Sequence, residues 1–180
     1  MASRRRFLKM MTCGSLLTLS GTEIADAAGK VIPSHKTLAL EHIHTGDKLK
    51  LTYFEHGRYV EEALREINYL LRDYHTGAIH PIDPALLDQL YDLKIMLGIN
   101  RPFFFSSGYR SPRTNARLRK RCRCAARHSL HMQGRAVDFH VEGLETRKIR
   151  NAALAMHRGG VGYYRRQNFI HLDTGRFRTW

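Results

Sequence analysis

Residues 129–141, SLHMQGRAVDFHV, combine a predicted strand with two residue types that commonly bind metal ions. Apolar and polar side chains alternate in RAVDFHV, and successive side chains of a strand point to opposite faces. Val137 and Phe139 are therefore expected on one face of the strand and Asp138 on the other. His131 lies in the segment that leads into this strand. The stretch predicts a strand with one buried apolar face and a carboxylate on the opposite face.

A second strand of the same character is predicted at residues 168–173, NFIHLD. Ile170 and Leu172 fall on one face of this strand, whereas His171 and Asp173 fall on the other. Two predicted strands thus carry polar side chains on the face that points away from their apolar residues. If the two strands belong to one sheet, these polar side chains can meet.

His131, Asp138 and His171 together supply two imidazoles and one carboxylate. This is the donor set of an open catalytic zinc site, in which a fourth position is left for water. Zinc makes bound water acidic enough to supply hydroxide near neutral pH and polarises a carbonyl group, so a Zn²⁺ site here would favour a hydrolase. The chain contains eleven histidines, however, and a single His–Asp spacing can arise by chance. From spacing alone, ordinary polar side chains remain the alternative.

The first half of the chain predicts a hairpin followed by two helices. Apolar positions alternate in residues 37–55 on both sides of a Thr-Gly-Asp turn, which is typical of a hairpin. Residues 58–75 carry apolar side chains at helical spacing. The next predicted helix has Asp83 as its cap, Pro84 at its first position and Gly98 at its end.

The second half of the chain alternates predicted strands and helices. Residues 103–107 form a strand, one helix begins after Ser111, and another ends at Gly159-Gly160. We therefore expect an α+β fold in which an antiparallel sheet carries the zinc site and helices pack on the other face. The helical segment 58–98 is expected to pack onto the site-bearing half as part of one domain.

Residues 1–27 have the features of an export signal. The stretch SRRRFLK has the form of a twin-arginine signal, and Ala25-Asp26-Ala27 places small residues where a signal peptidase cleaves. We expect a signal peptide at 1–27, a single zinc peptidase domain at 28–180 and export to the periplasm. The apolar run in the leader is too short to span a bilayer, so the mature chain is expected to have no transmembrane segment. A basic tail with a chance arginine pair is the alternative.

The chain is strongly basic, with 30 Lys and Arg residues against 16 Asp and Glu residues and a net charge of +14. Loss of residues 1–27 removes four basic and two acidic residues and leaves +12. Such a charge favours polyanionic partners. For an exported protein these are peptidoglycan or phospholipid head groups rather than nucleic acid. A solvated basic face without a specific partner is the alternative.

Two of the three cysteines, Cys122 and Cys124, remain once the leader is removed. A disulfide between residues two apart is strained, so we expect two thiols and no disulfide scaffold. The alternative is a zinc site formed by Cys122, Cys124 and His128, although a structural zinc site normally needs four ligands.

Residues 37–180 resemble the YcbK-like (MepK) murein endopeptidases, relatives of the D-Ala-D-Ala zinc metallopeptidases. The stretches that carry the resemblance are IHTGDKLK, DPALLDQLYDL, SGYRSPRTN, SLHMQGRAVDFHVEG, GGVGYY and NFIHLDTGRFRTW. The resemblance implies a hedgehog-like metallopeptidase fold and hydrolysis of peptidoglycan cross-links at meso-diaminopimelate or D-Ala linkages. It also implies that His131, Asp138 and His171 bind Zn²⁺ and that Arg110 binds substrate near the scissile carbonyl.

The sequence departs from the wider metallopeptidase group at the general base. Where many members have an acid or a histidine shortly before the last zinc ligand, this chain has Asn168 and Phe169. Asp173, on the same strand face as His171, is our first choice for the base. A second role for Asp173, orienting His171 through a hydrogen bond, stays open. A chain without a base would be a zinc-containing murein-binding module, which is the alternative function.

Overall fold

The computed structural model describes residues 33–122 and 125–180, without the side chain of Cys122. The predicted signal peptide, residues 1–27, lies outside the described residues, as do Cys124 and the side chain of Cys122. The expectations for the leader and for the two thiols therefore stay predictions.

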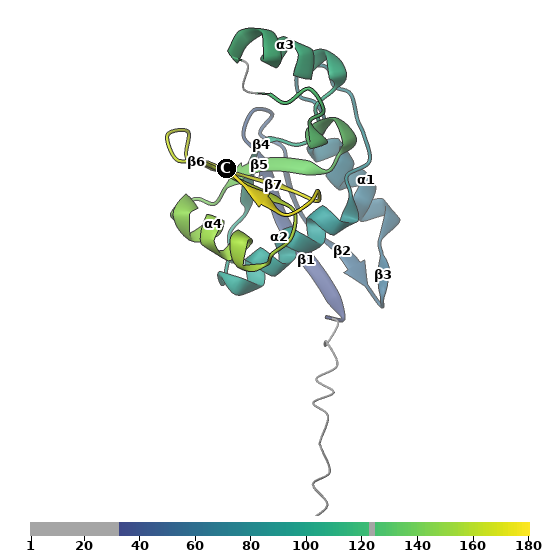
Figure 1. Cartoon of the computed structure of the whole chain (residues 1–180). Coiled ribbons are helices and arrows are strands. Elements are labelled where there is room, and N and C mark those ends of the chain that lie inside the picture. The colour runs from purple at the N-terminus through teal and green to yellow at the C-terminus, as the bar shows by residue number, and fades with distance from the viewer. Residues whose placement is uncertain (1–32, 123–124) are drawn as a thin grey trace, which may run out of the picture. The chain divides into compact units, whose positions relative to one another are not determined.

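One sheet of eight strands runs through the described residues in the order β3-β2-β1-β4-β5-β7-β6-β8. Figure 1 shows the sheet strands together with helices α1 to α4. The strands are β1 (His35–His42), β2 (Lys48–Glu55), β3 (Arg58–Tyr59), β4 (Phe103–Ser107), β5 (Ala136–His140), β6 (Gly160–Tyr164), β7 (Phe169–Asp173) and β8 (Arg178–Thr179). The helices are α1 (Glu61–Leu70), α2 (Pro84–Met96), α3 (Pro112–Cys122), α4 (Thr146–Ala155) and the short 3₁₀ helix η1 (Leu130–Gln133).

The sheet is mixed, so the expectation of an antiparallel sheet is wrong. β1 runs parallel to β4, and β6 runs parallel to β8. The first parallel pair arises because α1 and α2 lie between the N-terminal hairpin and β4, and such a crossover lets the chain return in the same direction. The second arises because β8 reverses direction after β7, which is itself antiparallel to β6. Between β4 and β6, where the predicted site residues lie, all pairs are antiparallel.

Local sequence signals correctly located the N-terminal hairpin and α2. β1 and β2 pair antiparallel, and Gly46 adopts a positive φ of +75° in the connection. In α2, the Asp83 side chain accepts a hydrogen bond of 3.0 Å from the Ala85 amide, and Pro84 occupies the first turn. Gly98 follows the helix with a φ of +60°, a conformation that favours glycine.

Two predicted helices have different bounds in the structure. α1 begins only at Glu61, because Arg58–Tyr59 pairs with β2 as the short strand β3. The helix expected to end at Gly159-Gly160 ends at Ala155, and Gly160 instead begins β6. No sequence pattern predicted β3, β6 or β8.

The apolar face of the sheet forms the core together with α1, α2 and α4. In β5 and β7 the side chains of Val137, Phe139, Ile170 and Leu172 are fully buried. They belong to the same apolar cluster as Ile67 of α1, Leu86 of α2 and Ile149 of α4. This burial anchors the two strands and leaves their polar side chains on the opposite face. None of the helices in the described residues is long and apolar enough to cross a membrane.

Candidate metal centre

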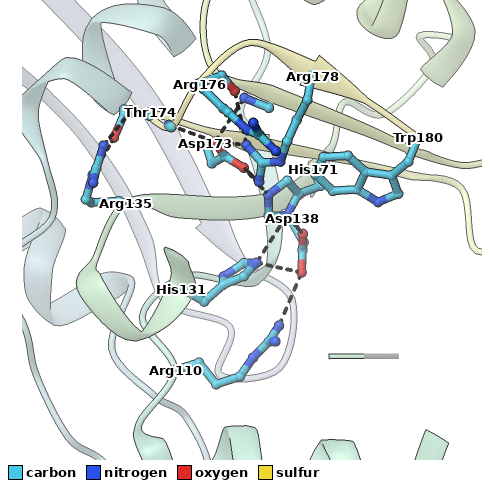
Figure 2. Close-up of polar contacts among 12 residues, drawn as sticks. Arg110, His131, Arg135, Asp138, His171, Asp173, Thr174, Arg176, Arg178 and Trp180 are labelled. Carbon is cyan, nitrogen blue, oxygen red and sulfur yellow. Dashed lines mark hydrogen bonds and ion pairs between the residues drawn. The ribbon is translucent and has the colours of Figure 1, made fainter. Parts of the chain in front are cut away.

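His131, Asp138 and His171 converge at one point of the structure (Figure 2). Asp138 of β5 and His171 of β7 are direct neighbours across the antiparallel ladder, and His131 approaches them from η1. The Nε2 atom of His131 lies 3.2 Å from His171 Nδ1 and 3.3 Å from Asp138 Oδ2. Asp138 Oδ1 lies 2.9 Å from His171 Nδ1. One potential ligand atom from each residue thus falls within 4.8 Å of the others.

The three side chains are largely removed from solvent. The exposed fraction is 2% for His131, 9% for Asp138 and 8% for His171. A buried ionised carboxylate is costly unless it is paired or coordinates a metal. The buried carboxylate of Asp138 therefore needs a positive charge beside it, which Arg110, a protonated imidazole or a bound cation can supply.

The outer nitrogen of each imidazole is bonded to a protein acceptor. His131 Nδ1 donates a hydrogen bond of 2.8 Å to the Gly108 carbonyl oxygen, and His171 Nε2 donates one of 2.9 Å to Asp173 Oδ2. In a neutral imidazole only one nitrogen carries a proton. When both rings are neutral, each directs a lone pair toward Asp138, as metal-binding histidines do when a second residue holds their other nitrogen; when the inward nitrogen is protonated, it donates to Asp138 instead. Two inward lone pairs and a carboxylate fit a divalent cation.

Neighbouring charges and burial set the protonation of the cluster. Burial opposes ionisation of Asp138, but the charge of His131 and hydrogen bonds from His131 and His171 outweigh it and hold the pKa of this carboxyl well below its usual range. Burial lowers the pKa of His131. For His171, burial is outweighed by hydrogen bonds to Asp138 and Asp173, which raise its pKa to about 9. A cation at Nδ1 competes with this proton, so binding should weaken as pH falls.

Asp173 is fully buried behind His171 and is surrounded by donors. Its Oδ1 accepts hydrogen bonds from the Gly160 amide at 2.9 Å and the Gly175 amide at 2.8 Å. Arg178 donates to both oxygens, at 3.1 Å to Oδ1 and 2.7 Å to Oδ2. Burial raises the pKa of Asp173, but the bonds from His171, Arg178 and the two amides lower it well below its usual range. Asp173 is therefore an ionised acceptor that touches the cluster through His171.

Arg110 approaches the cluster from the turn after β4. Its Nη2 donates a hydrogen bond of 3.1 Å to Ser107 Oγ and lies 3.5 Å from Asp138 Oδ2. The Arg110 amide donates to the His131 carbonyl oxygen at 3.1 Å, which ties the turn to η1. The guanidinium thus lies beside the ligand cluster, on the side opposite Asp173 (Figure 2).

A pocket of about 350 Å³ opens over the cluster. Besides the three cluster residues and Arg110, its lining includes three aromatic side chains and the helical residue Leu118 of α3. The aromatic residues are Tyr164, Phe169 and Trp180. A larger surface pocket of about 570 Å³ lies between α4 and the β6–β7 connection and contains none of the cluster residues.

Two residues at the site were missed by sequence reasoning, and two further histidines, His140 and His128, lie outside the ligand cluster. Arg178 and Trp180 were not singled out, because β8 is too short to give a periodic signal. Their only signal was their position shortly after the strand that carries His171. His140 lies on β5, where its ring stacks on Phe104 with centroids 5.3 Å apart. His128 is an exposed residue of the pocket lining.

The chain matches the family described as peptidoglycan L,D-endopeptidase MepK over residues 30–180. A peptidoglycan L,D-endopeptidase MepK of Escherichia coli (strain K12) is 47% identical over 148 residues, which cover 82% of this chain and 81% of the relative. A relative of the same name from Shigella flexneri has the same identity and coverage. A probable peptidoglycan L,D-endopeptidase MepK of Haemophilus influenzae is 37% identical over 149 residues, or 82% of this chain and 80% of the relative. No solved structure matches the chain significantly.

Proposed function

The chain belongs to the peptidoglycan L,D-endopeptidase MepK family, and from this premise we propose that it is a zinc-dependent hydrolase of peptidoglycan peptide cross-links. The observation that carries the proposal is the convergence of His131, Asp138 and His171, whose ligand atoms lie within 4.8 Å of one another. The finer proposal is that the bond cleaved joins two meso-diaminopimelate residues. The proposed location is the periplasm, where peptidoglycan lies.

His131 Nε2, His171 Nδ1 and the Asp138 carboxylate are proposed to hold the zinc ion. Zinc bound there supplies Lewis-acid chemistry, because it polarises a carbonyl group and makes water more acidic. The Gly108 carbonyl and Asp173 keep the outer imidazole nitrogens protonated and the rings oriented. These contacts pre-organise the donor set before substrate arrives.

Arg110 is proposed to bind the substrate at the scissile bond. Its guanidinium is a rigid fork of donors that suits a carboxylate or an oxygen that gains negative charge during the reaction. Within residues 33–122 and 125–180, Nη2 is the one donor of this fork that is engaged, by Ser107 and Asp138. A diaminopimelate cross-link carries a free carboxylate next to the scissile amide, which gives this fork a suitable acceptor.

Asp173 is proposed to act as a positioning residue. Of the two roles considered from the sequence, this one is supported by its contact with His171 Nε2 and by its donors Arg178, Gly160 and Gly175. A general base needs a free oxygen near the reacting water. The oxygens of Asp173 are already engaged and fully buried.

The charge of α3 supports a polyanionic substrate. The helix has no acidic residue in its first turn and carries Arg119, Lys120 and Arg121 in its last turn. With Arg113 and Arg117, these make five exposed basic side chains, none of which has an ion-pair partner among the described residues. Leu118 of the same helix lines the pocket over the cluster. The free carboxylates of peptidoglycan peptides complement this surface.

The test is digestion of purified peptidoglycan that contains diaminopimelate cross-links. The zinc-loaded mature chain should release new uncross-linked muropeptides, whereas Asp138→Ala should release none above background. Glu66→Ala, which changes an exposed acid of α1, is the matched control and should cleave as the parent does. Binding of peptidoglycan without new muropeptides would favour the binding-module alternative. Equal cleavage by Asp138→Ala would refute the ligand set.

A further inference from the structure

Trp180 lies at the edge of the candidate metal centre (Figure 2). It is the single tryptophan of the chain, and its ring centroid is 5.1 Å from that of His171. Nevertheless 49% of its surface is exposed, and it lines the pocket over the cluster. A half-exposed indole next to a buried ionic cluster leaves a large apolar surface in water unless something covers it.

The indole is held in place from several directions. The Trp180 amide donates to the Val161 carbonyl oxygen at 3.3 Å, and the Tyr163 amide donates to the Trp180 carbonyl oxygen at 3.0 Å. Its Nε1 donates a hydrogen bond of 2.9 Å to the hydroxyl of Tyr164. The guanidinium carbon of Arg178 lies 4.9 Å from the ring centroid. The ring therefore has little conformational freedom to lose when a ligand packs on it.

Gly162 provides the space in which the indole lies. A Cβ atom at this position would approach Trp180 Cε2 to 2.8 Å, closer than side-chain carbons come to one another. Gly162 also pairs with His171 in the β6–β7 ladder, so the absence of a side chain here brings the indole beside the candidate ligand. The third glycine of GGVGYY, Gly162, thus has a specific steric role at the site.

Two further aromatic side chains lie next to Trp180 on one side of the pocket. Tyr164 and Phe169 stack with ring centroids 4.3 Å apart, and Tyr164 is bonded to the indole. Arg110 lines the same pocket beside Asp138. The pocket thus offers an apolar surface together with a cationic fork that binds carboxylates.

We propose that Trp180 is a specificity-determining residue that packs against the aliphatic part of the cross-link residue flanking the scissile bond. Diaminopimelate fits this surface, because its methylene chain can lie on the indole while its carboxylate reaches Arg110. The indole is too close to the cluster for a sugar ring to be the partner, since peptide residues separate the glycan from the cross-link. This inference rests on the proposed function and adds to it the feature of the substrate that is recognised.

Because Trp180 is the only tryptophan, its fluorescence reports directly on the inference. The probe is a synthetic sugar-free peptide dimer joined through two diaminopimelate residues, mixed with the zinc-loaded chain and followed before turnover. We expect a blue shift of the emission and at least a twofold reduction of quenching by acrylamide. If the dimer is cleaved but leaves the Trp180 emission and its quenching by acrylamide unchanged, the inference is overturned and the proposed function stands. If the chain neither binds nor cleaves the dimer and also leaves whole peptidoglycan uncut, both the inference and the proposed function are refuted.

Two variants separate substrate contact from a structural role. Trp180→Ala should raise KM for the dimer about ten- to hundredfold, as loss of a buried aromatic contact does, with little change in kcat or in zinc affinity. Gly162→Ala, which keeps the tryptophan but displaces it, should raise KM in the same direction, and Trp180→Phe should fall between Trp180→Ala and the parent. Loss of zinc affinity with an unchanged KM would show that the indole only supports the ligands, and would overturn the inference.

Discussion

Asp173 and His171 are joined by a 2.9 Å hydrogen bond between the carboxylate Oδ2 and the ring nitrogen Nε2, the nitrogen that does not face His131. The opposite nitrogen, Nδ1, lies 2.9 Å from Asp138. This one contact determines which lone pair of His171 points toward the candidate metal centre.

Asp173→Asn should weaken zinc binding about 10- to 100-fold, as loss of a partner behind a metal-binding histidine does. An amide keeps the shape but loses the charge that holds the imidazole. If Asp173 positions His171, saturating zinc should restore most of kcat, and the pH profile of the restored enzyme should keep its apparent pKa values. Arg178→Gln should act in the same direction but more weakly, since Arg178 reaches the site through Asp173. If instead Asp173→Asn binds zinc as tightly as the parent but its kcat stays low at saturating zinc, Asp173 is the general base.

Metal binding should be visible through Trp180. Because the indole lies 5.1 Å from the ring of His171, Cu²⁺ or Co²⁺ bound at the cluster should quench its emission, and a chelator should restore it. His131→Ala should raise the metal concentration needed for half-maximal quenching at least tenfold, because it removes one of the three ligands. His157→Ala changes an exposed histidine outside the cluster and should leave the titration unchanged. The same titration curve for His131→Ala and the parent would place the metal elsewhere.

Arg110→Lys should lower kcat/KM for the peptide dimer by about 10²–10³, in the range seen when a donor to developing negative charge is removed. Lysine keeps the charge but cannot present a planar fork. Zinc affinity should change little, because the Arg110 side chain is not among the three ligand residues. Paired measurements of kcat/KM and zinc affinity check this expectation. A parallel loss of both would mean that Arg110 mainly supports Asp138.

Charge removal from α3 should reduce binding to intact peptidoglycan. Arg113, Arg117 and Arg121 follow one another at four-residue spacing and are exposed on α3. When all three are replaced by Gln, the fraction of protein that sediments with peptidoglycan at low salt should fall severalfold. Added salt should remove the difference between variant and parent, because it screens exposed charges. Cleavage of the short dimer should be unaffected. The control is the Arg147→Gln, Arg165→Gln double variant at the larger pocket, and an equal loss there would indicate non-specific attraction.

Asp73 should make folding stability depend on pH in the acid range. The carboxylate is 2% exposed and accepts hydrogen bonds of 2.9 Å from the amides of Ser111 and His75. Burial opposes ionisation, but hydrogen bonds with Ser111, Thr114 and His75 lower the pKa of Asp73 from 3.8 to about 2. Because the folded pKa is the lower one, the ionised carboxylate stabilises the protein by about 2 kcal/mol above pH 4, and this is lost as pH falls toward 2.

The comparison that isolates this effect is denaturant unfolding of the parent and of Asp73→Asn at several pH values. The difference in unfolding free energy should be constant above about pH 4 and should shrink below it. A difference that does not depend on pH would mean that packing around residue 73, rather than its charge, is what the substitution disturbs.

Local sequence patterns were sufficient for much of the fold. Alternation predicted β5 and β7 and placed Asp138 and His171 on the polar faces of their strands, because side-chain direction in a strand depends only on position along the chain. The cap at Asp83 and the positive φ of Gly98 likewise follow from neighbours a few residues away. The three candidate metal ligands could be named for the same reason, with the family resemblance as support.

Only the tertiary structure decided which strands are neighbours and which nitrogen of each histidine faces the centre. The parallel pairing of β1 with β4 depends on a connection that contains two helices, and no local pattern encodes it. β6 and β8 were missed because a glycine-rich pentapeptide and a two-residue strand carry no periodic signal. Packing between segments places Trp180 over Gly162 and brings Asp173 to His171 Nε2. The candidate ligands could therefore be predicted from the sequence alone, whereas the residues that orient them could not.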